Sequence, residues 1–129
     1  MRVALSPADA QVIRLMTARM ALRVPRPVGG RVRVADIIDQ VAYEMGLHRC
    51  DLCGADRRSV LFRGRAAICW LARQLTPASF PQLGAMLGGR DHSSAHHAYC
   101  RALEMRERDP AFHRLTDRIL THFRDLEED

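Results

Sequence analysis

Apolar residues recur every three or four positions along most of this 129-residue chain, and proline or glycine ends every such run except the last. This spacing is typical of helices that bury one face, whereas strand-like alternation of apolar and polar residues is nearly absent. The pattern therefore predicts an all-α protein. The expected helices cover residues 6–22, 34–45, 59–75 and 79–87, a stretch from residue 91 past residue 105, and residues 109–126.

Two of these helices meet at the glycine pair Gly88-Gly89. Ser79 is placed to cap the shorter helix, and Asp91 starts the longer one. Two helices around a glycine turn are the outline of a helix-turn-helix. The predicted fold is thus a helix-turn-helix bundle of about six helices with an additional N-terminal helix.

The segment from Pro25 to Gly30 holds two prolines and two glycines, and it cannot continue a helix. We therefore predict two parts: residues 1–33, an N-terminal helix and linker, and residues 34–129, the helix-turn-helix domain with its C-terminal helix. Both the N-terminal helix and the final helix carry an apolar stripe, so both are candidate docking surfaces. The N-terminal helix has other interpretations: it packs on the domain, follows a DNA backbone, or lies on a membrane surface.

All 20 basic residues are arginine, and with 15 acidic residues they leave a net charge of +5. Arginine forms bidentate contacts with phosphate and guanine, which suits nucleic acid, although the base composition of a genome produces the same bias. Charge alone does not separate DNA from an acidic membrane as the attracted polyanion. No apolar run is long enough for a bilayer and the N-terminus lacks a secretory signal, so we expect a cytoplasmic protein with no membrane partner.

Short polar residues occupy the first turn of the helix that follows the glycine pair: Asp91, His92, Ser93 and Ser94. Free backbone N–H groups at a helix N-terminus favour a phosphate, and first-turn side chains of a recognition helix contact base edges in the major groove. Asp accepts from an amino group, and His donates to a guanine or thymine acceptor. The alternative is that Asp91 and Ser94 merely cap the helix and His92 is solvated.

The string from Ser79 to Ala98, SFPQLGAMLGGRDHSSAHHA, closely resembles the signature of the C-terminal DNA-binding domain of DnaA, the bacterial replication initiator. Its most specific part is Gly-Gly-Arg-Asp-His-Ser-Ser at residues 88–94. The resemblance extends from about Val32 to Arg106. It implies double-stranded DNA as the partner.

The resemblance also implies a role for each matching residue. Arg57 or Arg58 would enter the minor groove, Arg65 and Arg73 would contact phosphates, Phe80 and Pro81 would lie against bases or sugars, Asp91, His92 and Ser93 would read bases, and Arg90 and Ser94 would support the backbone contacts.

Three departures from the family pattern occur. Phe80 stands where leucine is usual, Ser93-Ser94 replaces a pair that contains threonine, and Ala95 replaces a β-branched residue. Because lost methyl groups change which thymines are contacted, the preferred site is expected to differ from the family's DnaA box.

DnaA itself has an ATPase domain, but this chain has no lysine and therefore no Walker lysine. We thus expect no enzyme activity and no cofactor. The predicted function is sequence-specific binding of duplex DNA by a transcription regulator, for example of a prophage-like or gene-transfer element. It would act with transcription machinery, a second DNA-binding protein or another copy of itself. The alternative is a replication modulator that occupies DnaA-box-like sites without ATPase activity.

The spacing His48-x-Cys50-x2-Cys53 is similar to half of a zinc site, but no second paired motif completes it. We therefore predict no metal. By the resemblance, Cys50 and Cys53 fall where the related domains carry apolar core residues, which implies that they are small buried thiols. The resemblance also implies that His97 packs or hydrogen-bonds inside the domain, whereas His96 is either a phosphate contact or plain surface.

Overall fold

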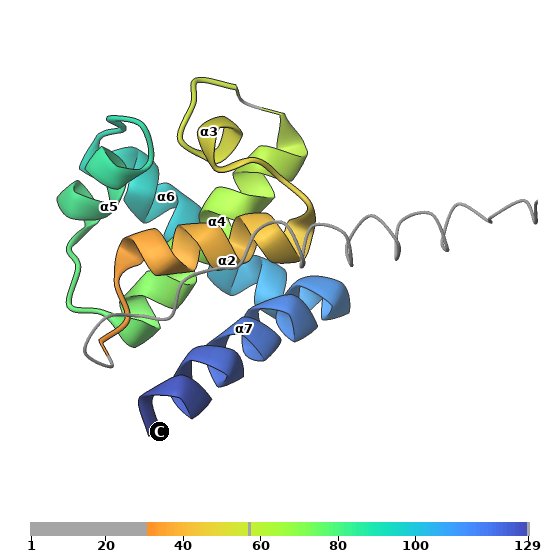
Figure 1. Cartoon of the computed structure of the whole chain (residues 1–129). Helices are drawn as coiled ribbons and strands as arrows, with labels where there is room; N and C mark the ends of the chain where they lie inside the picture. Colours follow the sequence, from red (N-terminus) through yellow and green to blue (C-terminus); the bar gives the residue numbers. More distant parts are fainter. Residues whose placement is uncertain (1–30, 57, 129) are drawn as a thin grey trace, which may run out of the picture.

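The computed structural model describes residues 31–56 and 58–128. Within them it contains six helices and no strand, so the all-α prediction is confirmed (Figure 1). The predicted N-terminal helix and Arg57 lie outside the described residues. The helices are α2 Val34–Met45, α3 Arg49–Leu52, α4 Ser59–Leu75, α5 Phe80–Met86, α6 His92–Arg108 and α7 Pro110–Glu128.

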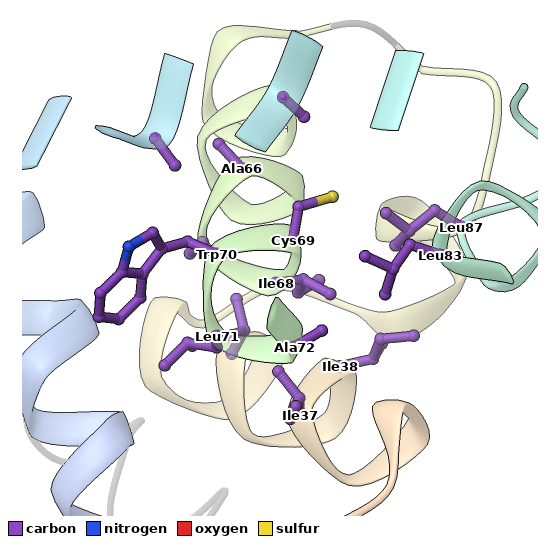
Figure 2. Close-up of a cluster of buried hydrophobic side chains, with 14 of the residues drawn as sticks. Ile37, Ile38, Ala66, Ile68, Cys69, Trp70, Leu71, Ala72, Leu83 and Leu87 are labelled. Atoms are coloured by element: carbon purple, nitrogen blue, oxygen red, sulfur yellow. The ribbon is translucent and has the colours of Figure 1, made fainter. Parts of the chain in front are cut away.

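Helix α4 forms the centre of the bundle and packs against α2, α6 and α7. Every residue from Ala66 to Ala72 is buried, as expected of a helix with neighbours on all sides. Figure 2 shows Ile37 and Ile38 approaching it from α2, and Leu83 and Leu87 from the α5 region. The core therefore joins the helix-turn-helix directly to the helices that precede it in the chain.

The start of α2 is tied to the residues just before it. Asp36, itself buried, accepts from Arg33 N at 2.9 Å, and its two oxygens accept from the Arg33 guanidinium at 3.0 and 3.1 Å. This pairing raises the pKa of Arg33. Val32 is buried against the core. Val32 therefore packs with the domain, and the exposed Arg33 pairs with its first helix, although the sequence places both residues in the linker.

Helix α7 buries its apolar stripe inside the bundle. Phe112 and Ile119 are fully buried and Phe123 is nearly so. Ion pairs flank this packing: Arg106 with Asp117 at 2.9 Å and Arg118 with Glu44 at 3.1 Å. The prediction that the stripe of the final helix is a docking surface is therefore wrong, because the core already covers it.

The one-turn helix α3 was not predicted from the sequence. Of its four residues only Leu52 is buried, and one turn is too short to show a helical period. Cys50 is exposed and Cys53 is half-buried, so the prediction of two buried thiols is wrong as well. The buried cysteine is Cys69 in α4, where burial raises the pKa of the thiol to about 12.

Candidate nucleic-acid interface

Helix α5 begins with a reciprocal cap. Ser79 N donates to Gln82 Oε1 at 2.8 Å, and Ser79 Oγ accepts from Gln82 N at 3.3 Å. This capping box satisfies donors that a first helical turn leaves free, and Pro81 in that turn needs no partner for an N–H group. The capping role predicted for Ser79 is confirmed.

The turn between α5 and α6 depends on glycine. Gly88 and Gly89 have positive φ angles of 87° and 75°, a region that L side chains rarely adopt. Gly84 in α5 allows the chain to pass close by: a Cβ there would lie 2.2 Å from Arg90 O. Arg90 N donates to Gly84 O at 2.8 Å. The turn therefore holds the start of α6 directly against α5.

The first turn of α6 presents polar side chains to solvent. Asp91 is its N-cap, and Asp91 Oδ1 accepts from Ser94 N at 2.8 Å. This backbone hydrogen bond lowers the pKa of Asp91, so the carboxylate is ionised at neutral pH. His92, Ser93 and Ser94 are exposed. An exposed, capped helix start of this kind is what a recognition helix inserts into a major groove.

Phe80 occupies the centre of an aromatic cluster beside this turn. Its ring lies 5.0 Å from the His96 ring, edge to face, and 5.6 Å from the Tyr99 ring. The Arg73 guanidinium lies 4.8 Å from the Phe80 centroid, and Arg73 Nη1 donates to Ala78 O at 3.0 Å. Phe80 thus packs against two exposed side chains from different helices, Arg73 of α4 and His96 of α6.

Arg58 stands exposed at the start of α4. Asp56 accepts from Arg58 N at 2.9 Å and from Arg58 Nε at 2.8 Å. These hydrogen bonds lower the pKa of Asp56. The loop before α4 therefore has a defined backbone at Arg58, while the Arg58 side chain, 65% exposed, remains open to a ligand.

Arg65 and Arg73 share helix α4 but have opposite surroundings. Arg65 is only 4% exposed. Its guanidinium donates to Leu52 O at 2.8 Å, Asp51 O at 2.9 Å and Gly54 O at 3.1 Å, and burial lowers its pKa. This geometry favours a structural role for Arg65 over the predicted phosphate contact, whereas Arg73 is exposed.

Between the loop before α4 and the start of α6 lies an open pocket of about 540 Å³. Phe62, Arg65 and Arg90 line it together with His97. His97 is exposed, and its ring lies 5.9 Å from the Phe62 ring, so the prediction that His97 packs or hydrogen-bonds inside the domain is wrong about its place. Phe62 was not among the residues predicted from the sequence. Its position three residues before Arg65 on α4 is the only signal that could have indicated it.

The described residues contain no group of three or more His, Cys, Asp or Glu that could hold a metal ion. Nor does any helix among them combine the length and apolar character that crossing a membrane requires.

Residues 34–101, a little over half of the chain, match the model of the bacterial DnaA protein helix-turn-helix. The chain belongs to the bacterial DnaA helix-turn-helix family. The chromosomal replication initiator protein DnaA of Caulobacter vibrioides (strain NA1000 / CB15N) is 38% identical over 81 residues, which are 63% of this chain and 16% of that relative. DnaA of Acinetobacter baumannii (strain AYE) is 34% identical over 111 residues, 85% of this chain and 24% of that relative. The chain thus spans 16 to 24% of the length of these curated relatives.

The resemblance drawn from residues 79–98 is therefore confirmed, and the chain carries a DNA-binding helix-turn-helix of the DnaA type. Its structure gathers two groups of the predicted site residues. The first comprises Arg73, Phe80 and Pro81 with the start of α6 at residues 91–94. The second is Arg58 and its loop, which Arg90 joins to the turn of this DnaA-type motif through a hydrogen bond to Gly54 O at 2.7 Å.

Proposed function

We propose that the chain binds duplex DNA with sequence preference and regulates transcription. The observation that carries this proposal is the first turn of α6, where Asp91 caps the helix and His92, Ser93 and Ser94 stand exposed. In helix-turn-helix proteins these positions contact base edges. The capping role of Asp91 is compatible with base contact, because Ser94 N donates to Oδ1 and a carboxylate oxygen can accept more than one hydrogen bond.

The remaining contacts follow from the surroundings of that turn. Arg73, exposed and ordered by Phe80, is proposed to neutralise a phosphate. Arg57 and Arg58 are proposed to enter the adjacent minor groove, where a narrow A·T tract attracts guanidinium groups. Pro81, which is exposed, and Phe80, which is half-buried, would lie against the rim of the major groove.

A replication role is the second candidate, and one observation favours it: the matched relatives are named chromosomal replication initiators. In this version the chain occupies DnaA-box-like sites. Because these 129 residues contain no lysine, they cannot supply the Walker lysine for ATP-driven steps. Any effect of these residues on replication would come from competition for DNA sites or from recruitment of a partner.

Selection from a pool of randomised duplexes tests DNA recognition itself. The expected result is one enriched motif, bound at least about 10³-fold more tightly than scrambled DNA at the same salt concentration. A Ser93→Ala/His92→Ala variant should bind the pool without enriching that motif. Equal binding of the wild-type chain to selected and scrambled duplexes would contradict sequence-specific recognition.

A genome-wide occupancy map then separates the two candidate functions. Peaks at promoters, with changed transcript levels on deletion, support the regulator. Peaks confined to the replication origin, with unchanged transcripts, would overturn the regulator in favour of the replication modulator.

We further propose that the chain acts with a partner or a second copy, because a single reader of this size finds many near-matches in a genome. Linking two readers raises affinity through effective concentration. Since the core covers the stripe of α7, residues 1–30 are the remaining candidate for docking. Deleting residues 1–30 should leave binding to an isolated site within a few-fold and abolish cooperative binding at paired sites. Retained cooperativity in the truncated chain would assign docking elsewhere.

A further inference from the structure

The loop after α3 is held against the turn of the helix-turn-helix through its backbone. Gly54 O accepts from two arginines: Arg90 Nη2 at 2.7 Å and Arg65 Nη2 at 3.1 Å. Beside it, Cys53 Sγ donates to Met86 O at 3.4 Å. Two of these contacts join residues more than thirty positions apart in the chain. The loop is therefore packed onto the turn.

Gly88 makes this close approach possible. A Cβ at residue 88 would lie 2.0 Å from Cys53 O, a distance at which the loop has to move. Gly89 has a similar positive φ angle, but a Cβ there would meet nothing within 4 Å. The two glycines thus share the backbone strain that any side chain would introduce. They differ in whether a side chain would displace the loop.

The same loop leads to the arginines proposed for the minor groove. It is held at one end by the contacts at Gly54, and at the other end Asp56 fixes Arg58 N at 2.9 Å where α4 begins. Arg90 also donates through Nη1 to Leu87 O, so both of its terminal nitrogens are directed to backbone carbonyls. Its guanidinium thus bridges the turn before α6 and the loop that carries Arg58.

We propose that Arg90 is a positioning residue: it fixes the position of the loop that carries Arg58 relative to the first turn of α6. The preference of the chain for an A·T minor groove then depends on Arg90, although the Arg90 guanidinium itself binds backbone carbonyls. This inference rests on the proposed function. It reassigns Arg90 from supporting phosphate contacts to coupling the two groups of DNA-contacting residues, one for each groove.

The test compares Gly88→Ala with Gly89→Ala on two duplexes. Both duplexes carry the motif recovered by selection; one keeps an A·T flank beside it and the other has G·C there. The wild-type chain should prefer the A·T flank, because the narrow minor groove attracts the loop arginines. In Gly88→Ala, as in Arg90→Ala, the ratio of the two Kd values should fall to about 1. Gly89→Ala should keep the wild-type ratio.

A double-mutant cycle separates positioning from direct contact. If Arg90 acts through the loop, Arg90→Ala combined with Arg57→Ala/Arg58→Ala should show no further loss of flank preference. If Arg90 instead binds a phosphate, Arg90→Ala lowers the magnitude of the salt slope by about 0.9 and keeps the flank ratio, which overturns the inference. Each variant is measured below its own melting temperature, determined by circular dichroism, so that a general loss of folding is not read as a loss of preference.

The remaining outcomes distinguish a failure of the proposed function from a failure of the positioning role alone. A wild-type chain that enriches no motif contradicts the proposed function itself. A wild-type chain that enriches a motif but ignores the flank, or one whose flank preference survives in both Gly88→Ala and Arg90→Ala, leaves DNA recognition in place and overturns only the positioning role.

Discussion

The two ends of helix α6 are held by different interactions. At its N-terminal end His92, Ser93 and Ser94 are exposed, Asp91 caps the helix, and the backbone hydrogen bond from Arg90 to Gly84 holds this end against α5. Toward the C-terminal end, Arg106 stacks on Trp70 of α4 at 3.9 Å and pairs with Asp117 of α7 at 2.9 Å. Backbone contacts thus hold the first end and leave its side chains open to a ligand, whereas side-chain contacts with two helices anchor the other end.

The buried face of α6 explains how one helix combines both properties. It consists of Ala95, Ala98 and Ala102, and such small side chains let α6 lie close to α4 along its length. The packing of these alanines therefore supports the polar first turn, and His92, Ser93 and Ser94 contribute no buried side chain. From this comparison we expect changes at the anchored end to reduce stability and changes at the exposed end to reduce DNA recognition.

The largest effect on stability is expected just beyond the anchored C-terminal end of α6, at the start of α7. Phe112 of α7 is fully buried and its ring faces the Arg63 guanidinium at 5.2 Å. Phe112→Ala should lower the free energy of unfolding by about 3–5 kcal/mol, because it leaves a cavity in the core. Urea denaturation followed by circular dichroism measures this. The folded fraction should still discriminate the selected duplex from a scrambled one, and a loss of discrimination at full folding would break the comparison.

The next largest effect is expected for Arg65→Ala, which tests whether Arg65 has a structural role or contacts a phosphate. Arg65→Ala removes the donor from Leu52 O and Asp51 O, so unfolding should become easier by about 1–3 kcal/mol. The salt dependence of DNA binding should stay at the wild-type slope. Arg118→Ala on α7, which also removes one positive charge, is the control for the salt dependence. If Arg65→Ala were as stable as wild type and lost about 0.9 of the slope, the residue would be a phosphate contact.

At the exposed end, His92→Ala should weaken binding to the selected duplex by about 1–3 kcal/mol, because one base contact is lost. Its stability should change by less than about 0.5 kcal/mol, since His92 is an exposed side chain. Fluorescence anisotropy with specific and scrambled duplexes measures the first quantity and thermal melting the second. His122→Ala, an exposed histidine on α7, is the control. Unchanged discrimination in His92→Ala would remove this residue from the reading set.

Arg73 should produce a smaller and less selective change. If it neutralises one phosphate, Arg73→Ala lowers the magnitude of the salt slope by about 0.9 on specific and random duplexes alike. Titrations at several salt concentrations test this, again beside Arg118→Ala. A slope equal to that of the wild type on both kinds of duplex would show that Phe80 holds Arg73 for packing alone.

The smallest effect concerns the Asp91 cap and pH. The hydrogen bond from Ser94 N lowers the pKa of Asp91 below its ordinary value of 3.8. The ionised cap therefore stabilises the fold above that value, and this contribution disappears as pH falls through the lowered pKa. The melting-temperature difference between wild type and Asp91→Asn should shrink as pH decreases below about 4. A difference that is constant with pH would mean that ionisation of Asp91 does not contribute.

Local signals were enough to predict most of the secondary structure. The predicted starts and ends of α2 and α4 agree with the structure, and the Ser79 and Asp91 caps stand at the starts of α5 and α6. Each of these signals acts within one or two helical turns, through a cap, a proline or a glycine with positive φ. For the same reason α3 was missed, since a single turn lacks any periodic signal.

The sequence by itself determined the five longer helices of the described residues, the turn of the helix-turn-helix and the polar first turn of α6, because neighbouring residues specify each of them. Only the tertiary structure decided which of Arg65 and Arg73 is buried, that Cys50 is exposed, and that α7 turns its stripe into the core. These properties depend on residues far apart in the chain. The hydrogen bonds of Arg65 and Arg90 to one carbonyl at Gly54 exist only because α3, α4 and the turn before α6 pack together.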